Sequence, residues 1–596
     1  MLCTGVSPTA ARGRSSLWGA QLNTAHGSRR LAATLLAAAL AGTALTVAAA
    51  PAAHAAASDA VAKLPISSYS GLAVDSVHQR VYVADRRDDN GAGTVVVYDF
   101  QGQKVSTLQH QSAVSGVALS EDSTTLYVGE RGRVVSYDAG TLEQNGAHGA
   151  AYDTCGRQLA VAGGTVWSTD AYVFQDYLCA TASTALDRLT DGTVSRTGWN
   201  DVGRLQLAPG ARGQNRLLMG QPSDSGAANP FLASFDVSGT TPVRDAARRF
   251  ADADGKGALD LKDMAASPDG SQVAVADAAA GTRLLKAGDL SDAPEQYQAL
   301  PAGATSTAVA FSGDGKYLAR GAQAAGSTPD LLVQSADPAD RTPPLEFAFE
   351  GSLDGNGVAP RGLAWSQDGS RLFAVTRGGG PEYWLHVIQP PAVQYDARFA
   401  GDLTHSPAGA VAGEPLAVRG RLEWDGPAPA EPLKVTAVRK DATGTHRLGT
   451  ATVKDDGTFA VLDEPDLVGE ATYTLSFLGD LTHRPATDVT HTVTVGKAPS
   501  SIALTAPAEA TMSGGVHITG TFTAQGKALP ERAVLTVRRT DRLGTGTLSS
   551  VTVGADGTFA VDDLPRTRRE TTYTVSWAGD DLHTGATASA TVYVRR

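Results

Sequence analysis

The chain has 596 residues, of which 42% are hydrophobic and 19% are charged, and its formal net charge is −12. This length exceeds what one hydrophobic core supports, and the apolar fraction is that of folded domains, so we expect several globular domains rather than a disordered chain. The acidic balance, without clusters of Lys and Arg, argues against a surface that binds nucleic acid.

Residues 1–57 have the pattern of a secretory signal peptide. The basic pair Arg29-Arg30 precedes an apolar run over 31–49, and small residues follow at Ala53-His54-Ala55. This pattern predicts cleavage and export by the general secretory or the twin-arginine route, with an uncleaved membrane anchor as the alternative. No later run is long and apolar enough to span a membrane. We therefore expect a protein that is secreted or held non-covalently at the cell wall.

Two cysteines, Cys155 and Cys179, remain after the signal peptide. An even pair in an oxidising compartment predicts a disulfide. The bond would close a loop of about 25 residues, for which the chain-entropy model gives roughly 3 kcal/mol of stabilisation. The alternative is two unrelated buried thiols.

Residues 58–391 repeat a hairpin pattern in which a strand of small residues is followed by a turn and an alternating strand. The clearest copy covers 264–276, with its turn at Asp269-Gly270. Seven copies can be placed, at spacings from 42 residues (160 − 118) to 58 (265 − 207), close to the length of a four-stranded blade. The residues that mark their first strands are Ala73, Ala118, Ala160, Leu207, Ala265, Ala310 and Ala364. The pattern predicts a seven-bladed β-propeller whose inner strands carry small residues at the crowded axis.

The strands Leu126-Tyr127-Val128-Gly129 and Arg80-Val81-Tyr82-Val83-Ala84 resemble the strand motif of the YVTN/WD40-like family of bacterial β-propellers. The resemblance implies a ring closed by strands from both ends of the domain. A strand near 61–66 would then join the blade that contains 383–388. It also implies relatives that include lactone hydrolases and lyases working from the central channel.

Residues 392–496 and 497–596 are tandem copies. The sequence Asp456-Gly457-Thr458-Phe459-Ala460-Val461 recurs one hundred residues later (556 − 456). The domain boundary falls at Pro390-Pro391, because successive prolines stop a strand ladder. Each copy contains about seven short alternating strands, which is typical of an immunoglobulin-like β-sandwich. The predicted fold class is thus all-β throughout.

The segments from Tyr473 to Asp480 and from Tyr573 to Asp580 are each followed by a histidine three positions later. They resemble the bacterial Ig-like repeat family. That resemblance implies spacer or adhesive modules of secreted and surface proteins, with Tyr473 and Tyr573 at the position of a tyrosine corner.

The stretch from Asp252 to Asp263 imitates a calcium-binding loop, with Asp252, Asp254, Asp260 and Asp263 as candidate ligands. Lys256 stands at a ligand position, however. Its ammonium about 4 Å from a divalent ion would cost roughly 8 kcal/mol at an effective dielectric of 20. We therefore interpret the stretch as a polar loop between blades and predict neither a metal nor a cofactor.

Three further patterns have weaker functional interpretations. The duplicated Asp-x-x-His supplies at most two metal ligands per copy, so a turn-forming aspartate with an exposed histidine is expected. Channel candidates and candidates for a sugar-stacking surface lie near the cysteine pair, although solvated loops and local packing explain them more simply. These residues are His148, Asp153 and Asp170 for the channel and Tyr172, Phe174 and Tyr177 for stacking.

These patterns favour a non-enzymatic extracellular or cell-surface binding protein, with no catalytic residue assigned. A propeller face would recognise an extracellular protein or a cell-wall glycan, and the Ig-like repeats would act as spacers or wall contacts. The alternative is a propeller hydrolase or lyase with an Ig-like targeting tail; a third interpretation is a structural matrix component. The central channel discriminates the first two, because convergent Asp, Glu, His or Arg side chains would favour chemistry.

Overall fold

The computed structural model describes residues 59–86, 92–110, 112–130, 132–149, 158–171, 184–201, 205–221, 231–250, 259–351, 355–429, 431–526, 528–529 and 531–596. These residues form β-strands and turns with no α-helix among them, so none supplies a helix able to cross a membrane. The chain is all-β, as predicted. The signal peptide, Cys155 and Cys179 lie outside the described residues, and the signal peptide and the disulfide stay predictions.

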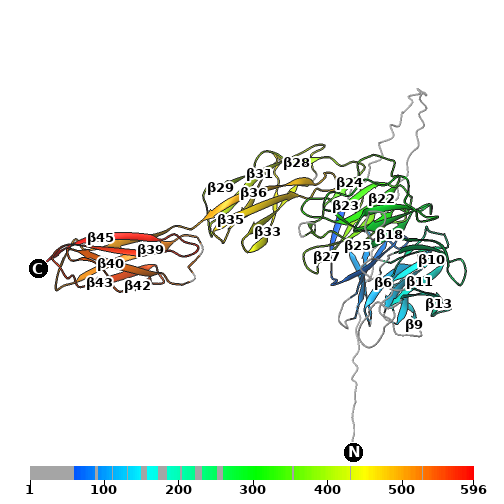
Figure 1. Cartoon of the computed structure of the whole chain (residues 1–596), viewed down its shortest axis with the longest axis horizontal. Helices are drawn as coiled ribbons and strands as arrows, with labels where there is room; N and C mark the ends of the chain where they lie inside the picture. The colour runs from blue at the N-terminus through cyan, green and yellow to red at the C-terminus, as the bar shows by residue number, and fades with distance from the viewer. Residues whose placement is uncertain are drawn as a thin grey trace, which may run out of the picture. The chain divides into compact units, whose positions relative to one another are not determined.

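Antiparallel sheets of consecutive strands follow one another from Asp59 to Ile388 (Figure 1), and the described residues of this region form seven of them. The first four are β2 (Tyr69–Asp75), β3 (Arg80–Asp85), β4 (Thr94–Asp99) and β5 (Lys104–Gln109); β6 (Val114–Leu119), β7 (Thr125–Glu130), β8 (Arg133–Asp138) and β9 (Gln144–Gly149); β10 (Leu159–Ala162), β11 (Thr165–Ala171), β12 (Thr184–Thr190) and β13 (Thr193–Asp201); and β14 (Gln206–Pro209), β15 (Arg216–Gly220), β16 (Phe231–Asp236) and β17 (Val243–Arg249).

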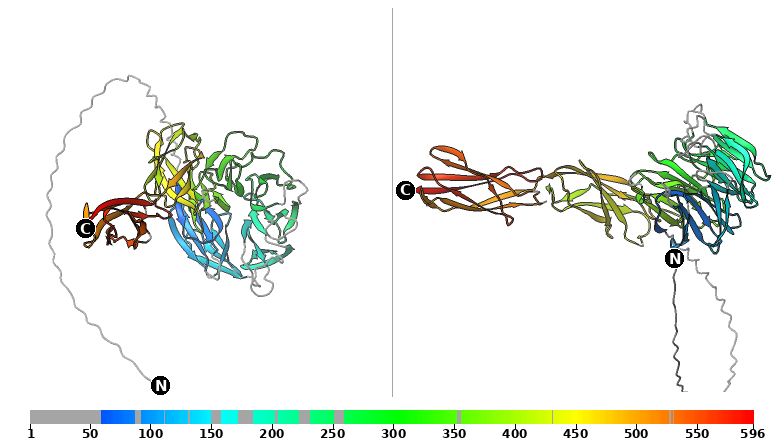
Figure 2. Two further views of the ribbon diagram at one scale, coloured as in Figure 1. Left: turned by 60° about the vertical axis from the view of Figure 1, so that its left-hand side comes forward. Right: turned by 90° about the horizontal axis from the view of Figure 1, so that it is seen from below.

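The remaining three sheets are β18 (Leu261–Ala266), β19 (Gln272–Asp277) and β20 (Gly281–Lys286); β21 (Thr305–Phe311), β22 (Tyr317–Gln323), β23 (Leu331–Ser335) and β24 (Leu345–Phe347); and β25 (Val358–Trp365), β26 (Leu372–Arg377) and β27 (Tyr383–Ile388) with β1 (Asp59–Leu64). Each hairpin predicted from the sequence is present as the first two strands of a sheet. Figure 2 shows these sheets from two further directions.

The first and last sheets of this region are joined by the N-terminal strand. β1 pairs antiparallel with β27, from Asp59 opposite Ile388 to Leu64 opposite Tyr383. The Tyr69 hydroxyl also donates to the Arg361 carbonyl at 2.8 Å. The predicted closure, a strand near 61–66 in the sheet of 383–388, is confirmed. The pairing completes a four-stranded sheet in which β1, rather than β27, is the edge strand.

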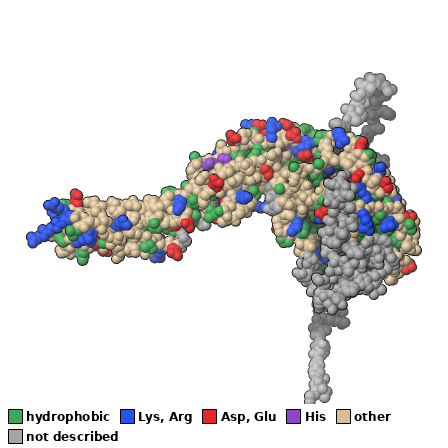
Figure 3. Space-filling view, in the orientation of Figure 1, with side chains coloured by type: hydrophobic (Ala, Val, Ile, Leu, Met, Phe, Trp, Pro, Cys, Tyr) green, Lys and Arg blue, Asp and Glu red, His purple; other side chains and the backbone are tan. Residues whose placement is uncertain are grey.

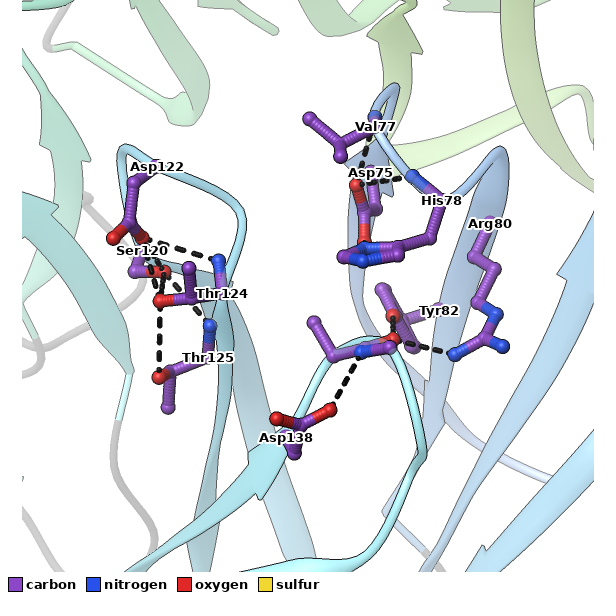
Figure 4. Close-up of polar contacts among 12 residues, drawn as sticks. Asp75, Val77, His78, Arg80, Tyr82, Ser120, Asp122, Thr124, Thr125 and Asp138 are labelled. Atoms are coloured by element: carbon purple, nitrogen blue, oxygen red, sulfur yellow. Dashed lines mark hydrogen bonds and ion pairs between the residues drawn. The ribbon is translucent and has the colours of Figure 1, made fainter.

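Four of the hairpin turns share one hydrogen-bond pattern, which explains their Ser-x-Asp sequences. Ser312 Oγ donates to Asp314 Oδ1 at 2.7 Å and accepts from the backbone N–H of Tyr317 at 2.9 Å. The turn at Ser120 repeats both bonds with Asp122 and the N–H of Thr125 (Figure 4). The same bonds recur in the turns that begin at Ser267 and Ser366. A side chain that replaces a backbone partner in this way favours a tight turn over a longer strand.

Residues 397–595 form two further units, each built from two facing sheets. In the first, β28 (Ala397–Phe399), β29 (Thr404–Ser406), β31 (Leu416–Trp424) and β34 (Thr458–Asp463) face β30 (Ala410–Val411), β32 (Lys434–Asp441), β33 (Gly444–Thr452), β35 (Gly469–Phe477) and β36 (Ala486–Gly496). In the second, β37 (Ser500–Thr505), β39 (Val516–Ala524) and β43 (Thr558–Asp563) face β38 (Glu509–Thr511), β40 (Val534–Asp541), β41 (Gly544–Thr547), β42 (Val551–Thr552), β44 (Arg569–Trp577) and β45 (Ala586–Arg595).

Each unit has its own hydrophobic core, and the duplicated residues occupy equivalent places. The Tyr473 hydroxyl donates to Asp463 and the Tyr573 hydroxyl donates to Asp563, both at 2.7 Å. At Gly520, a Cβ atom would come within 2.3 Å of the Phe559 ring, so the close approach of that ring requires glycine. The hundred-residue repeat is therefore a repeat of packing as well as of sequence.

The duplicated Asp-x-x-His differs from expectation in one respect, because its histidines are buried rather than exposed. His483 and His583 are both 0% exposed. Asp580 Oδ1 accepts from the N–H of His583 at 2.7 Å, and the His583 ring nitrogen lies 2.8 Å from the same oxygen. The turn also holds the segment that leads into its own unit, since the N–H of Ala498 donates to the Leu582 carbonyl at 2.8 Å. We call this arrangement, in which an aspartate holds the turn and the turn bonds to the segment that enters the unit, the clamp.

Candidate ligand site in the central channel

A cavity of about 410 Å³ runs between the first strands of all seven sheets in residues 59–388. Its wall is built from small and apolar side chains at the residues that mark the predicted hairpins. All of these line the cavity: Ala73, Ala118, Ala160, Leu207, Ala265, Ala310 and Ala364. Small residues are required because these strands converge on one axis. The prediction that the inner strands carry them is confirmed.

Asp263, on β18, is one of two charged residues among the described residues that line this cavity. Its carboxylate accepts from the N–H of Val309 at 3.0 Å and from the N–H of Met264 at 2.8 Å. Burial raises the pKa of Asp263 to about 7, although both N–H groups and the positive charge of Arg361 act in the opposite direction. This carboxyl can therefore exchange a proton near neutral pH.

Arg361, on β25, is the other charged residue of the wall. It lies in a stretch where the register between β25 and β26 shifts, and its φ of 58° is in the left-handed region. Such a backbone is uncommon outside glycine and persists where surrounding contacts hold it. Here the contacts come from the first sheet, because the Arg361 guanidinium donates to the Ser70 carbonyl at 2.9 Å and its carbonyl accepts from Tyr69.

A second cavity of about 280 Å³ continues the first at the hairpin-turn end of the inner strands. The two share lining residues that include Leu119, Val161 and Trp365. The lining of the second cavity includes more residues with polar side chains, and these come from turns of different sheets. Those with a charge or an amide are Glu121, Arg212, Gln214 and Gln367. Side-chain amides and charges thus gather at the hairpin-turn end of the channel.

Trp365 lies where the two cavities meet. Its ring nitrogen donates to the Ala310 carbonyl at 3.0 Å, which fixes the indole in one orientation. The Tyr317 ring stacks against it, with centroids 6.1 Å apart and an angle of 18° between the planes. A fixed aromatic face beside amide and charged groups is a common composition for small-ligand sites.

The structure separates the calcium-loop candidates that it describes. Asp263 lines the channel, whereas Asp260 pairs with Lys262 at 2.8 Å and is not part of the cavity wall. Asp252 and Asp254 lie outside the described residues. Within the described part of the chain, no group of three or more His, Cys, Asp or Glu side chains is placed to hold a metal ion.

His148 lies away from the channel, on the outermost strand β9 of its sheet. Its ring contacts Ser136 and the Gly192 carbonyl, both at 3.1 Å. The side chain of Asp170 lies outside the description, as do Asp153 and the aromatic candidates Tyr172, Phe174 and Tyr177. Sequence reasoning missed Arg361, for which the available signal was Pro360-Arg361-Gly362, a polar interruption in a strand of otherwise small apolar residues.

The successive antiparallel sheets, their closure by β1 and the shared axial cavity define a β-propeller. No family model matches the chain, and no curated protein matches it. In fold, the chain is similar to the β-propeller domain of Cps50 (Swd1) from Myceliophteria thermophila, at 14% identity over 55% of this chain and 98% of that one, with a TM-score of 0.39. It is also similar to hydrazine synthase of Kuenenia stuttgartiensis, at 14% identity over 52% of this chain and 94% of that one, with a TM-score of 0.34. The propeller assignment rests on strand order and closure, not on these two similarities.

Proposed function

We propose that this protein is a secreted, extracellular or wall-associated binding protein. Its seven sheets are the blades of one YVTN/WD40-like ring, and the two C-terminal units are Ig-like sandwiches. The ligand enters at the hairpin-turn end of the channel, and we assign it to the glycans of the cell envelope.

The observation that carries this proposal is the group of amide and charged side chains at the hairpin-turn end of the channel. Trp365 is largely buried and lines the cavity with its indole held in one orientation, and Gln214, Gln367 and Arg212 line the cavity beyond it. Amide and guanidinium groups donate to hydroxyl and ring oxygens, while an aromatic face packs against the apolar face of a sugar. The cavity of about 280 Å³ has room for a sugar unit, and an extended glycan can continue into solvent.

The sandwiches support the proposal as spacers. Each has its own core, and each clamps the segment that leads into it through the Asp-x-x-His turn. A clamped connection limits the freedom of the chain at that point, which suits a module that holds a binding domain away from a surface.

The test is sedimentation of the full mature chain with purified peptidoglycan and with whole cell envelope. Replacing Gln214 and Gln367 by Ala removes two amides from the cavity, and we expect at least ~10-fold weaker sedimentation because each lost hydrogen bond costs about 1 kcal/mol. Gln103→Ala, an exposed glutamine outside both cavities, is the matched control and should sediment like the wild type.

Three outcomes separate the possibilities. Loss of sedimentation in the double variant alone supports the glycan site. Sedimentation with whole envelope but not with peptidoglycan, abolished by protease treatment of the envelope, would assign the ligand to protein instead. Equal sedimentation of the wild type, the double variant and Gln103→Ala, or none for any of them, would show that the channel does not bind the envelope.

A second candidate function rests on Asp263. A carboxyl with a pKa of about 7 near a guanidinium in a channel can serve as a general acid or base, which fits a propeller hydrolase or lyase with an Ig-like targeting tail. Turnover of lactones or polysaccharides that disappears in Asp263→Asn, with envelope binding retained, would establish this alternative. Absence of turnover in the wild type under the same assays would leave the binding function.

A further inference from the structure

Two histidines of the first sandwich lie in direct contact. His405 is on β29 and His491 is on β36, so they come from the two facing sheets. Nδ1 of His405 lies 2.8 Å from Nε2 of His491, and the ring centroids are 5.1 Å apart. Both side chains are partly exposed. Figure 3 shows histidine side chains on the surface of this unit.

The contact of Nε2 of His405 determines that Nδ1 is the nitrogen of this ring with a lone pair. Nε2 of His405 lies 3.2 Å from the Ala408 carbonyl, an acceptor that requires a proton on Nε2. In a neutral ring, Nδ1 of His405 then carries a lone pair directed at His491. Histidine ligands of metals commonly donate their other ring nitrogen to a backbone carbonyl in this way.

The two rings also lack an acidic neighbour. Among the described residues, neither histidine forms an ion pair with a carboxylate, unlike His446 and His517, which contact Asp441 and Asp562. Neutral imidazole is the form that binds a metal ion.

We propose that His405 and His491 form a binding site for one late first-row divalent cation, Cu²⁺ or Zn²⁺. Imidazole nitrogen suits these ions, and Cu²⁺ binds most tightly of the series. Metal–nitrogen bonds of about 2.0–2.1 Å at right or tetrahedral angles place the two nitrogens about 2.9–3.4 Å apart. The distance between the two nitrogens therefore needs to grow by only a few tenths of an ångström. The proton of their hydrogen bond, carried by Nε2 of His491, moves to the other nitrogen of that ring, and both rings turn their lone pairs toward the metal. Water or a donor from another molecule takes the remaining coordination positions.

The second sandwich provides an internal comparison. Tyr473 lies opposite His491 on β36, and its counterpart Tyr573 lies opposite Ala590 on β45. In the first sandwich, Thr404 precedes His405 and lies opposite Arg419. In the second, Thr505 lies opposite Thr519, the counterpart of Arg419. The residue after Thr505, Ala506, is therefore the equivalent of His405. The same scaffold thus carries alanine at both positions.

The experiment titrates the untagged mature chain with Cu²⁺ and with Zn²⁺, by calorimetry for both and by electron paramagnetic resonance for Cu²⁺. We expect one cation per chain and a Cu²⁺ spectrum with two nitrogen ligands. His405→Ala and His491→Ala should each lower affinity at least ~10-fold, because half of the protein ligands are lost. His517→Ala should bind like the wild type.

A variant with a second site tests the proposal even if the single variants fail to fold. Combining Ala506→His with Ala590→His should raise the stoichiometry from one cation per chain to two. Near-ultraviolet circular dichroism checks that each variant is folded. The proposal is overturned if the wild type binds neither cation, or if both single variants keep wild-type affinity.

Discussion

Asp263 places a carboxyl group, largely buried, in the wall of the central cavity. Its carboxylate has two backbone N–H donors, yet these donors and Arg361 do not offset the loss of water, so its pKa rises to about 7. A buried carboxyl of this kind favours the protonated form. Its position between two sheets links the N–H of Val309 on β21 to β18, which gives it a structural role beside any role in the channel.

Replacing Asp263 by Asn removes a titratable carboxyl group. We therefore predict that the difference in stability between the wild type and this variant depends on pH. The folded state holds the proton up to about pH 7, whereas the unfolded state releases it near pH 4, so the folded state binds more protons in between. The free energy of unfolding of the wild type should therefore fall, relative to Asp263→Asn, as the pH rises from about 4 to about 7. Urea unfolding at a series of pH values measures this difference, and parallel curves would contradict it.

At the scale of elements, local hydrogen bonds form the hairpins, whereas a strand distant in the chain closes the ring. Each hairpin is specified by its own turn, as in the Ser312 and Ser366 turns, and the sequence therefore predicted all seven. Closure depends on a strand far away in the chain. β1 presents one face to the core, with Leu64 only 3% exposed, and the other to solvent, with Val61 56% exposed.

These two residues of β1 provide a matched pair. Leu64→Ala should lower the free energy of unfolding by about 2–4 kcal/mol, because it leaves a cavity in the cluster that contains Phe373 and Val387. Val61→Ala should change it by less than about 0.5 kcal/mol, because most of that side chain is already in water. Thermal unfolding of both variants measures the contrast. Equal losses would show that β1 contributes through its backbone pairing alone.

At the scale of the whole molecule, the same clamp is used twice. Tyr395 pairs with the turn at His483, and Ala498 pairs with the turn at His583. In each case an aspartate holds the turn, and the buried histidine packs beneath it. The repeated Asp-x-x-His was interpreted from sequence as a turn, but the burial of its histidine depends on the segment that crosses it, which no local pattern encodes.

Asp580→Ala removes the acceptor of the N–H groups of Leu582 and His583 and leaves His583 buried without that partner. We expect the free energy of unfolding of the second C-terminal unit to fall by about 1–3 kcal/mol, with the unfolding of the first C-terminal unit unchanged. Hydrogen exchange resolved by peptide distinguishes the two units. Asp581→Ala, the adjacent exposed carboxylate, is the control, and equal protection in both variants would exclude the clamp.

The sequence by itself determined what short-range chemistry controls: the all-β class, the hairpins with their turns, the strand of small residues in each sheet and the tandem repeat. These follow from alternation, turn residues and identity at a fixed offset, which act over a few residues or by duplication. Closure through β1 was anticipated from the resemblance to known β-propellers rather than from a local pattern.

Only the tertiary structure decided which distant side chains meet. Asp263 and Arg361 line one channel because the sheets converge on an axis, and the left-handed backbone of Arg361 is held by bonds from the first sheet. His405 and His491 meet because two sheets face each other in the first C-terminal unit, although neither position is marked by a local motif. Such contacts depend on packing between segments far apart in the chain, and therefore on the free energy of the whole fold rather than on local propensity.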